Sequence, residues 1–339
     1  MLIRFVLDNL FSFGVQKEFT TIPNNRLKTL NHHKYEVVED ISILKLSSIY
    51  GANGAGKSNI IKSLDLFQKL ILNEEIPFYY KKSKFKFNID RKDKKQTFAI
   101  EFVQENQPFY YGIELVDNTI ATEELYLSGL GLKEDSLIYE RKTNSEGVTE
   151  VNFLEAFEKD DKSQILKSIL LEEFIKPTVP ILKLLSNRDN KFLKDVKMAY
   201  SWFDETMQII TPESKPVALT HTIDKNRNFK KYAEDIMCSF NIGISSLNTQ
   251  KRDIDEFFGK DNEGEKEEII KELEKSPKKM ITLGSNRGDE FVIVKEGEEI
   301  WVKRLEIELK IAGGKSALLE FPDVSDGTIR LLDFVPAFK

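Results

Sequence analysis

The stretch GANGAGKSN, residues 51–59, decides the fold of this chain. It fits the pattern G-x-x-x-x-G-K-[S/T], in which a glycine, Lys57 and Ser58 close the motif. Glycines let successive backbone N–H groups turn inward around an anion, and a side chain at Gly54 or Gly56 would obstruct that approach. The pattern therefore predicts a loop that binds the phosphates of a nucleotide, here called the phosphate loop.

The flanking residues predict a strand before this loop and a helix after it. The apolar run ISILKLSSIY (41–50) has the length of a buried strand that ends at Gly51. A helix over 58–72 would direct the positive end of its dipole toward the phosphates. The apolar positions at helical spacing are Ile60, Ile61, Leu64, Phe67, Leu70 and Ile71. This context favours a nucleotide site over an ordinary glycine-rich turn.

The loop residues have distinct expected roles. Lys57 can reach the β- and γ-phosphates of ATP, so it is the expected catalytic residue. The hydroxyl of Ser58 can ligate the Mg²⁺ that accompanies the nucleotide. The residues expected to bind ATP are Asn53, Gly54, Ala55, Gly56, Lys57, Ser58 and Asn59.

The rest of the sequence alternates between strand-rich and helical patterns. Residues 1–22 predict two strands, and short apolar runs between Lys84 and Tyr139 predict an antiparallel meander. A helical pattern follows from about residue 150. The segment 253–279 is so rich in charge that we expect an exposed helix there. Strands then return, ahead of a final helix.

This order predicts an α/β fold in three parts. The first is a lobe that holds the phosphate loop and the antiparallel meander (1–150). The second is a helical insertion (151–280), which Pro177 and Pro180 interrupt. The third holds the return strands and the last helix of a second lobe (281–339).

Composition excludes several classes of protein. Hydrophobic residues make up 40% and charged residues 31% of the 339 residues, as in globular proteins with an ample core. No apolar run approaches the roughly 18 residues of a membrane span. The single cysteine, Cys238, excludes an internal disulfide and indicates a reducing cytoplasm. Because the net charge is −6, contact with nucleic acid would require a local basic patch.

The clearest basic patch is the segment YYKKSKFKFNIDRKDKKQ (79–96). Its cations could follow a phosphate backbone while Tyr79 and Tyr80 stack on bases. A solvated hairpin tip is the alternative interpretation. The cations are Lys81, Lys82, Lys84, Lys86, Arg91, Lys92, Lys94 and Lys95.

Other chemical motifs are weak or absent in the sequence. No Ser/His/Asp set, Cys/His cluster or paired acidic motif indicates a nuclease or a protease. The adjacent residues His32 and His33 are interpreted as a solvated pair in a loop, with part of a metal site as the alternative.

Several stretches resemble ATPases with an ABC-type head, the branch that includes chromosome-maintenance and double-strand-break repair ATPases. Asn53 within G-x-N-G-x-G-K-S is typical of that branch, DNLFSF (8–13) resembles its opening strand, and the meander resembles its antiparallel subdomain. VSDGTIRLL (324–332), here called the signature segment, resembles the degenerate signature E-S-D-G-T-x-R-L. That signature belongs to AAA-family ATP-binding proteins of bacterial phage-defence and abortive-infection systems.

The resemblance implies a role for the signature segment at the nucleotide of another subunit. There it would contact the γ-phosphate, so that ATP joins a head-to-tail dimer. The implied contacts are Ser325, Asp326, Gly327 and Thr328. The simpler interpretation is that Ser325 or Asp326 only caps the last helix. Val324 stands where an acid is usual, and the resemblance offers Gln96 as a glutamine that senses Mg²⁺.

Hydrolysis in such heads uses four apolar residues followed by Asp and Glu. FVIVKE (291–296) and YGIELVD (111–117) come nearest, and neither has adjacent carboxylates after a full apolar run. In the resembling proteins this strand follows the signature helix. We therefore expect the central sheet to lack this strand within these 339 residues. The favoured explanation is that the strand belongs to a longer parent protein. A natural truncation and a strand supplied by a separate chain are the alternatives.

The function that these patterns predict is an ATP-binding, Mg²⁺-dependent ATPase subunit that dimerises around nucleotide. By resemblance it would regulate a toxic partner, such as a nuclease, in anti-phage defence. Two alternatives stay open. One is a maintenance or repair ATPase that clamps DNA, and the other is a scaffold that ATP gates without being hydrolysed.

Overall fold

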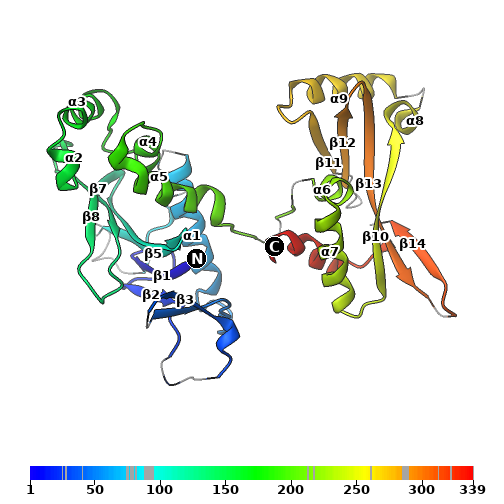
Figure 1. The fold of residues 1–339 in the computed structure, drawn as a ribbon, viewed down its shortest axis with the longest axis horizontal. Helices are drawn as coiled ribbons and strands as arrows, with labels where there is room; N and C mark the ends of the chain where they lie inside the picture. Colours follow the sequence, from blue (N-terminus) through cyan, green and yellow to red (C-terminus); the bar gives the residue numbers. More distant parts are fainter. Residues whose placement is uncertain are drawn as a thin grey trace. The chain divides into compact units, whose positions relative to one another are not determined.

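The computed structural model divides into two compact units, residues 1–209 (unit 1) and 210–339 (unit 2), and each is described by itself (Figure 1). It describes residues 1–24, 26, 29–39, 41–73, 76, 80, 82–87, 95–211, 214–216, 218–259, 262–284, 290–311, 313–320 and 323–338. Within those ranges, no helix has both the length and the apolar character that crossing a membrane requires.

Unit 1 is built on a seven-stranded sheet in which every neighbouring pair is antiparallel. Its order is β2-β1-β5-β6-β7-β8-β9. The bounds are β1 Leu2–Asp8, β2 Lys17–Thr20, β5 Gln96–Gln104, β6 Gln107–Val116, β7 Thr119–Leu127, β8 Ser136–Thr143 and β9 Thr149–Phe153. The two opening strands are thus confirmed, and so is the meander from Gln96 onward, which β9 extends beyond its expected end. Its expected beginning at Lys84 is wrong, because Lys84 makes only an isolated bridge with Leu10 and residues 85–87 are in no strand.

Helix α1 (Lys57–Leu72) packs against this sheet and confirms the helix expected after the phosphate loop. Phe67 lies at the centre of the contact, with its ring 5.0 Å from that of Phe98 and 5.8 Å from that of Phe203. One apolar position was assigned to the wrong face: Ile61 is 41% exposed, whereas Leu66 is buried. The error is one of phase, because adjacent residues lie about 100° apart on a helix.

Short helices follow the meander, as the periodicity predicts, and form a group to one side of the sheet (Figure 1). The helices are α2 Glu155–Glu158, α3 Asp161–Ile169, α4 Leu182–Ser186 and α5 Lys194–Ser201, with π-helical turns at Leu170–Phe174 and Trp202–Thr206. The break before α4 contains Pro177 and Pro180, which cannot donate backbone hydrogen bonds.

A buried polar network attaches that break to the sheet. Glu123 of β7 accepts hydrogen bonds from the backbone N–H groups of Ile181 and Leu182, at 2.9–3.1 Å, and from Arg141 of β8 at 3.2 Å. Glu123 and Arg141 are both 0% exposed. Arg141 also donates to the carbonyls of Val179 and Lys176. These bonds satisfy backbone groups that the prolines leave outside a helix.

The apolar run before the phosphate loop forms a shorter strand than expected. Strand β4 (Ile41–Leu44) pairs with β3 (Lys34–Val38) in a separate hairpin, and residues 45–50 are exposed and in no strand. Leu46 is 71% and Tyr50 is 90% exposed. The expectation of a buried strand over 41–50 is therefore wrong here. A strand is stable only when neighbours satisfy its backbone, and β3 is the one partner that the described residues give β4.

Unit 2 is a second antiparallel sheet with helices on both faces. Its strands are β10 Ile244–Asp253, β11 Met280–Gly284, β12 Glu290–Glu296, β13 Glu299–Lys310 and β14 Ser316–Glu320. Its helices are α6 Leu219–Lys225, α7 Arg227–Ser239, α8 Ile254–Phe258, α9 Glu263–Lys275 and α10 Asp326–Phe334. Strand β13 pairs with β10 along one side, and with β12 and then β14 along the other.

Alternate residues of β13 serve two separate cores. Leu305 and Ile307 pack with α6, α7 and α10, whereas Val302 packs with α8 and α9 on the opposite face. The charged segment around α9 is therefore not a plain exposed helix: Ile269 is 7% and Leu273 is 0% exposed, and both pack in one cluster with residues of β12 and β13. Helix α9 itself lies beside β11 and β12 (Figure 1). Its few apolar residues fall on one face, four positions apart, and that face is buried.

Candidate functional site

The phosphate loop joins the exposed segment before it directly to α1. Gly56 is the N-cap of α1, with φ 94° and ψ 4°, and Gly54 has φ 82°. Both values lie in the left-handed region, which costs glycine far less than other residues. Residues 51–55 are exposed. The loop is therefore open to a ligand at the N-terminus of a 16-residue helix, where backbone N–H groups lack intrahelical partners.

Lys57 turns its side chain back over the same loop. Its Nζ donates to the carbonyl oxygens of Gly51, at 2.7 Å, and Ala52, at 2.8 Å. These bonds hold the ammonium group beside the turn whose amides surround an anion in loops of this kind. Phosphate oxygens are stronger acceptors for an ammonium than peptide carbonyls, so an anion in the loop would compete for this charge.

The segment after β1 supports the loop from outside it. Asn59 of α1 donates from Nδ2 to the Oγ of Ser12, at 3.0 Å. A Cβ placed on Gly56 would lie 2.6 Å from that same oxygen and 3.3 Å from the Phe13 ring. Gly56 is therefore required both by its φ and by the close approach of Ser12. Residue spacing alone did not identify Ser12, and its one signal was its place in DNLFSF (8–13).

The loop suits a nucleotide with Mg²⁺ on chemical grounds. The first turn of α1 holds no acidic residue that would repel phosphate, and Ser58, at its second position, is exposed. No hydrogen bond within the described part of the chain engages the Ser58 hydroxyl. Lys57 and the loop amides would hold the phosphates, and Ser58 would supply one oxygen to Mg²⁺. Among the described residues, no group of three or more His, Cys, Asp or Glu could hold a metal by itself.

The signature segment begins helix α10 in unit 2. Ser325 is its N-cap, and its Oγ accepts from the N–H of Thr328 at 3.3 Å and lies 2.9 Å from the Thr328 hydroxyl. The capping interpretation is thus confirmed for Ser325. Asp326 and Gly327 are exposed, while Leu332 anchors the helix with no exposed surface. The cap engages the N–H of Thr328, so the N–H groups of Asp326 and Gly327 are the ones that this helix start leaves for an anion.

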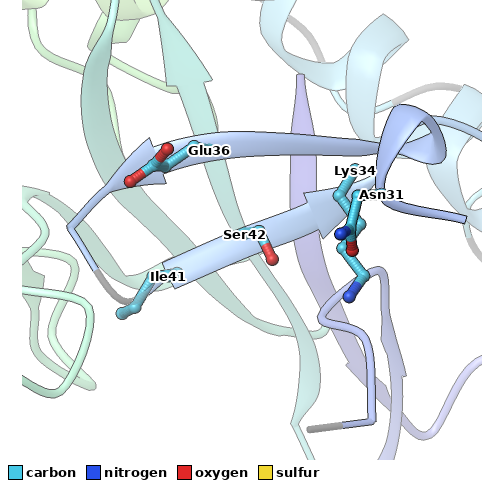
Figure 2. A pocket seen from close by; sticks show the side chains of 5 residues that line it. All are labelled: Asn31, Lys34, Glu36, Ile41 and Ser42. Carbon is cyan, nitrogen blue, oxygen red and sulfur yellow. The ribbon is translucent and has the colours of Figure 1, made fainter. Parts of the chain in front are cut away.

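A pocket of about 400 Å³ lies along the β3–β4 hairpin of unit 1 (Figure 2). Its lining combines an amide, a cation, a carboxylate, a hydroxyl and one apolar side chain: Asn31, Lys34, Glu36, Ile41 and Ser42. None of the residues expected to bind nucleotide lines it. His32 and His33 precede β3, are exposed, and have rings 4.1 Å apart, which agrees with a solvated pair.

The structure corrects part of the interpretation of the basic segment. Tyr80 is 1% exposed, and burial raises the pKa of its hydroxyl, so its ring is unavailable to stack on bases. Lys84 pairs with Asp117 at 3.1 Å, and Lys95 pairs with Glu114 at 2.6 Å. Lys82 is exposed. Several members of the segment lie outside the described residues: Tyr79, Lys81, Arg91, Lys92 and Lys94.

Gln96 does not match the role of a glutamine that senses Mg²⁺. Its side chain is fully buried at the start of β5, and its Nε2 donates to the Oγ of Ser83 at 3.1 Å. A glutamine that ligates Mg²⁺ must present its oxygen to a hydrated ion. Here the amide belongs to the interior of unit 1.

The expected site residues thus form two sets, each within its own unit. Asn53 to Asn59 lie together at the start of α1, and Ser325 to Thr328 lie together at the start of α10. Residues 46–339 match the model of a family described as "AAA domain, putative AbiEii toxin, Type IV TA system". A comparison with curated proteins found no match.

Proposed function

The chain belongs to this family of AAA domains, and we propose that it binds ATP with Mg²⁺ at the phosphate loop. The observation that carries the proposal is the loop itself. Two left-handed glycines precede a long helix, and Lys57 is held over the turn. In this role Lys57 exchanges its bonds to Gly51 and Ala52 for phosphate oxygens. Ser58 ligates Mg²⁺, and the first turn of α1 stabilises the charge through its amides.

The second part of the proposal is that two copies engage one nucleotide. The signature segment of one copy would face the γ-phosphate held by the phosphate loop of the other, in a head-to-tail dimer. Support comes from the exposure of Ser325, Asp326 and Gly327 at the start of a capped helix that Leu332 anchors. An exposed helix start offers amides and a positive dipole end to an anion.

The third part concerns the biological role. The family links AAA domains to toxin–antitoxin and abortive-infection systems. We place this chain there as the nucleotide-dependent subunit that restrains or releases a toxic partner. A DNA clamp is the less favoured alternative, because Tyr80 is buried and two of the lysines are already in ion pairs.

The test is ATP binding and single-turnover hydrolysis by the purified chain beside Lys57→Ala. We expect binding that depends on Mg²⁺ in the wild type and at least a tenfold weaker affinity in the variant, because the amides alone must then balance the phosphate charge. Equal affinities for the two proteins would sink the proposal. Binding without phosphate release would favour a scaffold that ATP gates over an ATPase.

A further inference from the structure

Arg330, within the signature segment, makes contacts that a helix cap does not explain. Its guanidinium donates through one terminal nitrogen to the carbonyl of Ser214 and through the other to the carbonyl of Thr211. Asp333, one turn along α10, accepts from the same group at 3.3 Å. The guanidinium carbon lies 4.4 Å from the centre of the Phe334 ring. Four different contacts therefore fix one side chain that is 25% exposed.

The two residues that supply these carbonyls also bond to each other. The N–H of Thr211 donates to the Oγ of Ser214 at 2.9 Å, and the N–H of Ser214 donates to the carbonyl of Thr211 at 3.1 Å. Only a planar guanidinium offers donors on two nitrogens in a fixed arrangement. A lysine could serve either carbonyl as a single point charge, but it could not reproduce both bonds and the contact with Phe334 together.

Thr211 and Ser214 occupy a special place in the chain. Unit 1 ends at Ile209 and unit 2 begins at Ile210, so these residues are where the chain enters unit 2. Arg330 lies only two positions after Thr328, whose hydroxyl and N–H meet Ser325. The same nine-residue helix thus carries the expected γ-phosphate contacts at its start and holds this connection through Arg330 at its middle.

We propose that Arg330 is a positioning residue that attaches the connection between the units to the signature helix, so that a nucleotide engaged at Ser325 also restrains the chain at Thr211 and Ser214. The inference rests on the proposed function for its nucleotide-dependent part. The attachment itself requires no nucleotide. Restraint at one end of a short helix reaches the other because its backbone hydrogen bonds make it a rigid element.

The experiment is amide hydrogen exchange at Thr211 and Ser214, with and without ATPγS and Mg²⁺, in the wild type, Arg330→Gln and Arg330→Lys. Without nucleotide, we expect about tenfold faster exchange at both amides in Arg330→Gln than in the wild type, and an intermediate rate in Arg330→Lys. Arg252→Gln, at an exposed arginine of the same unit, is the control and should exchange like the wild type. Equal rates in Arg330→Gln and the wild type would refute the attachment.

With ATPγS at a concentration that saturates each protein, exchange at these amides should slow further in the wild type but not in Arg330→Gln. If Arg330 only stabilised α10, Arg330→Gln would raise the exchange rates but ATPγS would still slow them. If ATPγS binds and wild-type exchange is unchanged, the coupling is wrong and the proposed function stands. If no nucleotide binds, the proposed function fails, and the nucleotide-free comparison still decides the attachment. Circular dichroism separates unfolding of Arg330→Gln from local release, and Arg330→Lys provides the milder second variant.

Discussion

At Gly56 two separate requirements meet in one residue. Its φ of 94° excludes most side chains, and Ser12 lies where a Cβ would go. Gly54 shares only the first requirement, because its φ is 82° and nothing lies within 4 Å of its Cβ position. The two glycines of one motif therefore separate the cost of backbone strain from the cost of a clash.

We predict that Gly56→Ala destabilises unit 1 more than Gly54→Ala does. Each should lose about 1–2 kcal/mol because alanine is strained in the left-handed region. Only Gly56→Ala must also displace the Ser12 oxygen, which would shift the start of α1. Urea unfolding of both variants tests this, and adding Ser12→Ala to Gly56→Ala should recover part of the loss. Equal losses for the two single variants would contradict the clash.

Ser325 allows the cap to be separated from the proposed phosphate contact. Ser325→Asp should keep α10 intact, because aspartate is as good an N-cap as serine. Its negative charge should nevertheless oppose a γ-phosphate, so dimerisation with ATP should need at least tenfold more protein. Light scattering with ATP and Mg²⁺ measures this, with Asn226→Asp, the cap of α7, as the control. Unchanged assembly would exclude Ser325 from the nucleotide interface.

At the scale of elements, both units use buried charge to attach helices to sheets. In unit 1 Glu123 and Arg141 hold the segment before α4, and burial beside Glu123 raises the pKa values of Tyr111 and Tyr139 well above the ordinary range. In unit 2 the Nζ of Lys303 bonds Asp224 of α6 at 2.8 Å and also reaches Glu296. These contacts determine where short helices sit, which apolar packing alone would leave less specific.

Breaking the Glu123 network should be costly. We predict that Glu123→Gln lowers the free energy of unfolding by about 3–5 kcal/mol, because it leaves the buried Arg141 charge without its partner. The matched control is Glu155→Gln, which removes an exposed ion pair with Lys159 on α2 and should change stability little. Chemical denaturation compares the two, and a loss below about 1 kcal/mol for Glu123→Gln would refute the buried-charge argument.

Lys303 lies among His221, Asp224 and Glu296, and this cluster should make the stability of unit 2 fall in acid. Burial and the Lys303 charge lower the pKa of His221 from its ordinary 6.5, so the folded state resists protonation. As pH falls below about 6.5, the unfolded state binds the proton more readily, and stability must fall. Burial raises the pKa of Asp224, but its bonds with Lys303 and Lys251 lower it overall, so its contribution is lost in stronger acid.

We therefore expect the urea concentration at the unfolding midpoint of unit 2 to decrease when the pH is lowered from 7.5 to 5.5. The decrease should be smaller in His221→Gln. His33→Gln serves as the control, because that histidine is exposed in unit 1. The same slope with pH in His221→Gln and the wild type would show that another group is responsible.

At the scale of the whole molecule, each unit has its own interior. The large core around Phe67 draws only on residues of unit 1, and the two cores on either side of β13 draw only on residues of unit 2. The candidate phosphate loop, its helix and its support at Ser12 all belong to unit 1.

We predict that residues 1–209 fold alone and bind ATP with an affinity within about threefold of the full chain, when both are too dilute for a second copy to engage the nucleotide. The reason is that every contact observed around the phosphate loop is internal to that unit. Calorimetric titration of both proteins tests this, with Lys57→Ala in the short protein as the control. A folded but non-binding short protein would mean that unit 2 of the same copy contributes to the nucleotide site.

The features that neighbouring residues dictate could be predicted from the sequence. Glycines at fixed spacing and a period of 3.6 specify the loop and α1, and a period of 2 specifies the meander, because backbone conformation and amphipathic faces are local properties. Contacts between groups far apart in the sequence could be seen only in the folded chain. Ser12 lies 47 positions before Asn59, and Glu123 lies 58 before Ile181. Residues 45–50 and α9 also differ from the expectation for this reason. A strand needs partner strands, and a charged helix buries its apolar face only where a sheet is there to cover, and no local pattern specifies either.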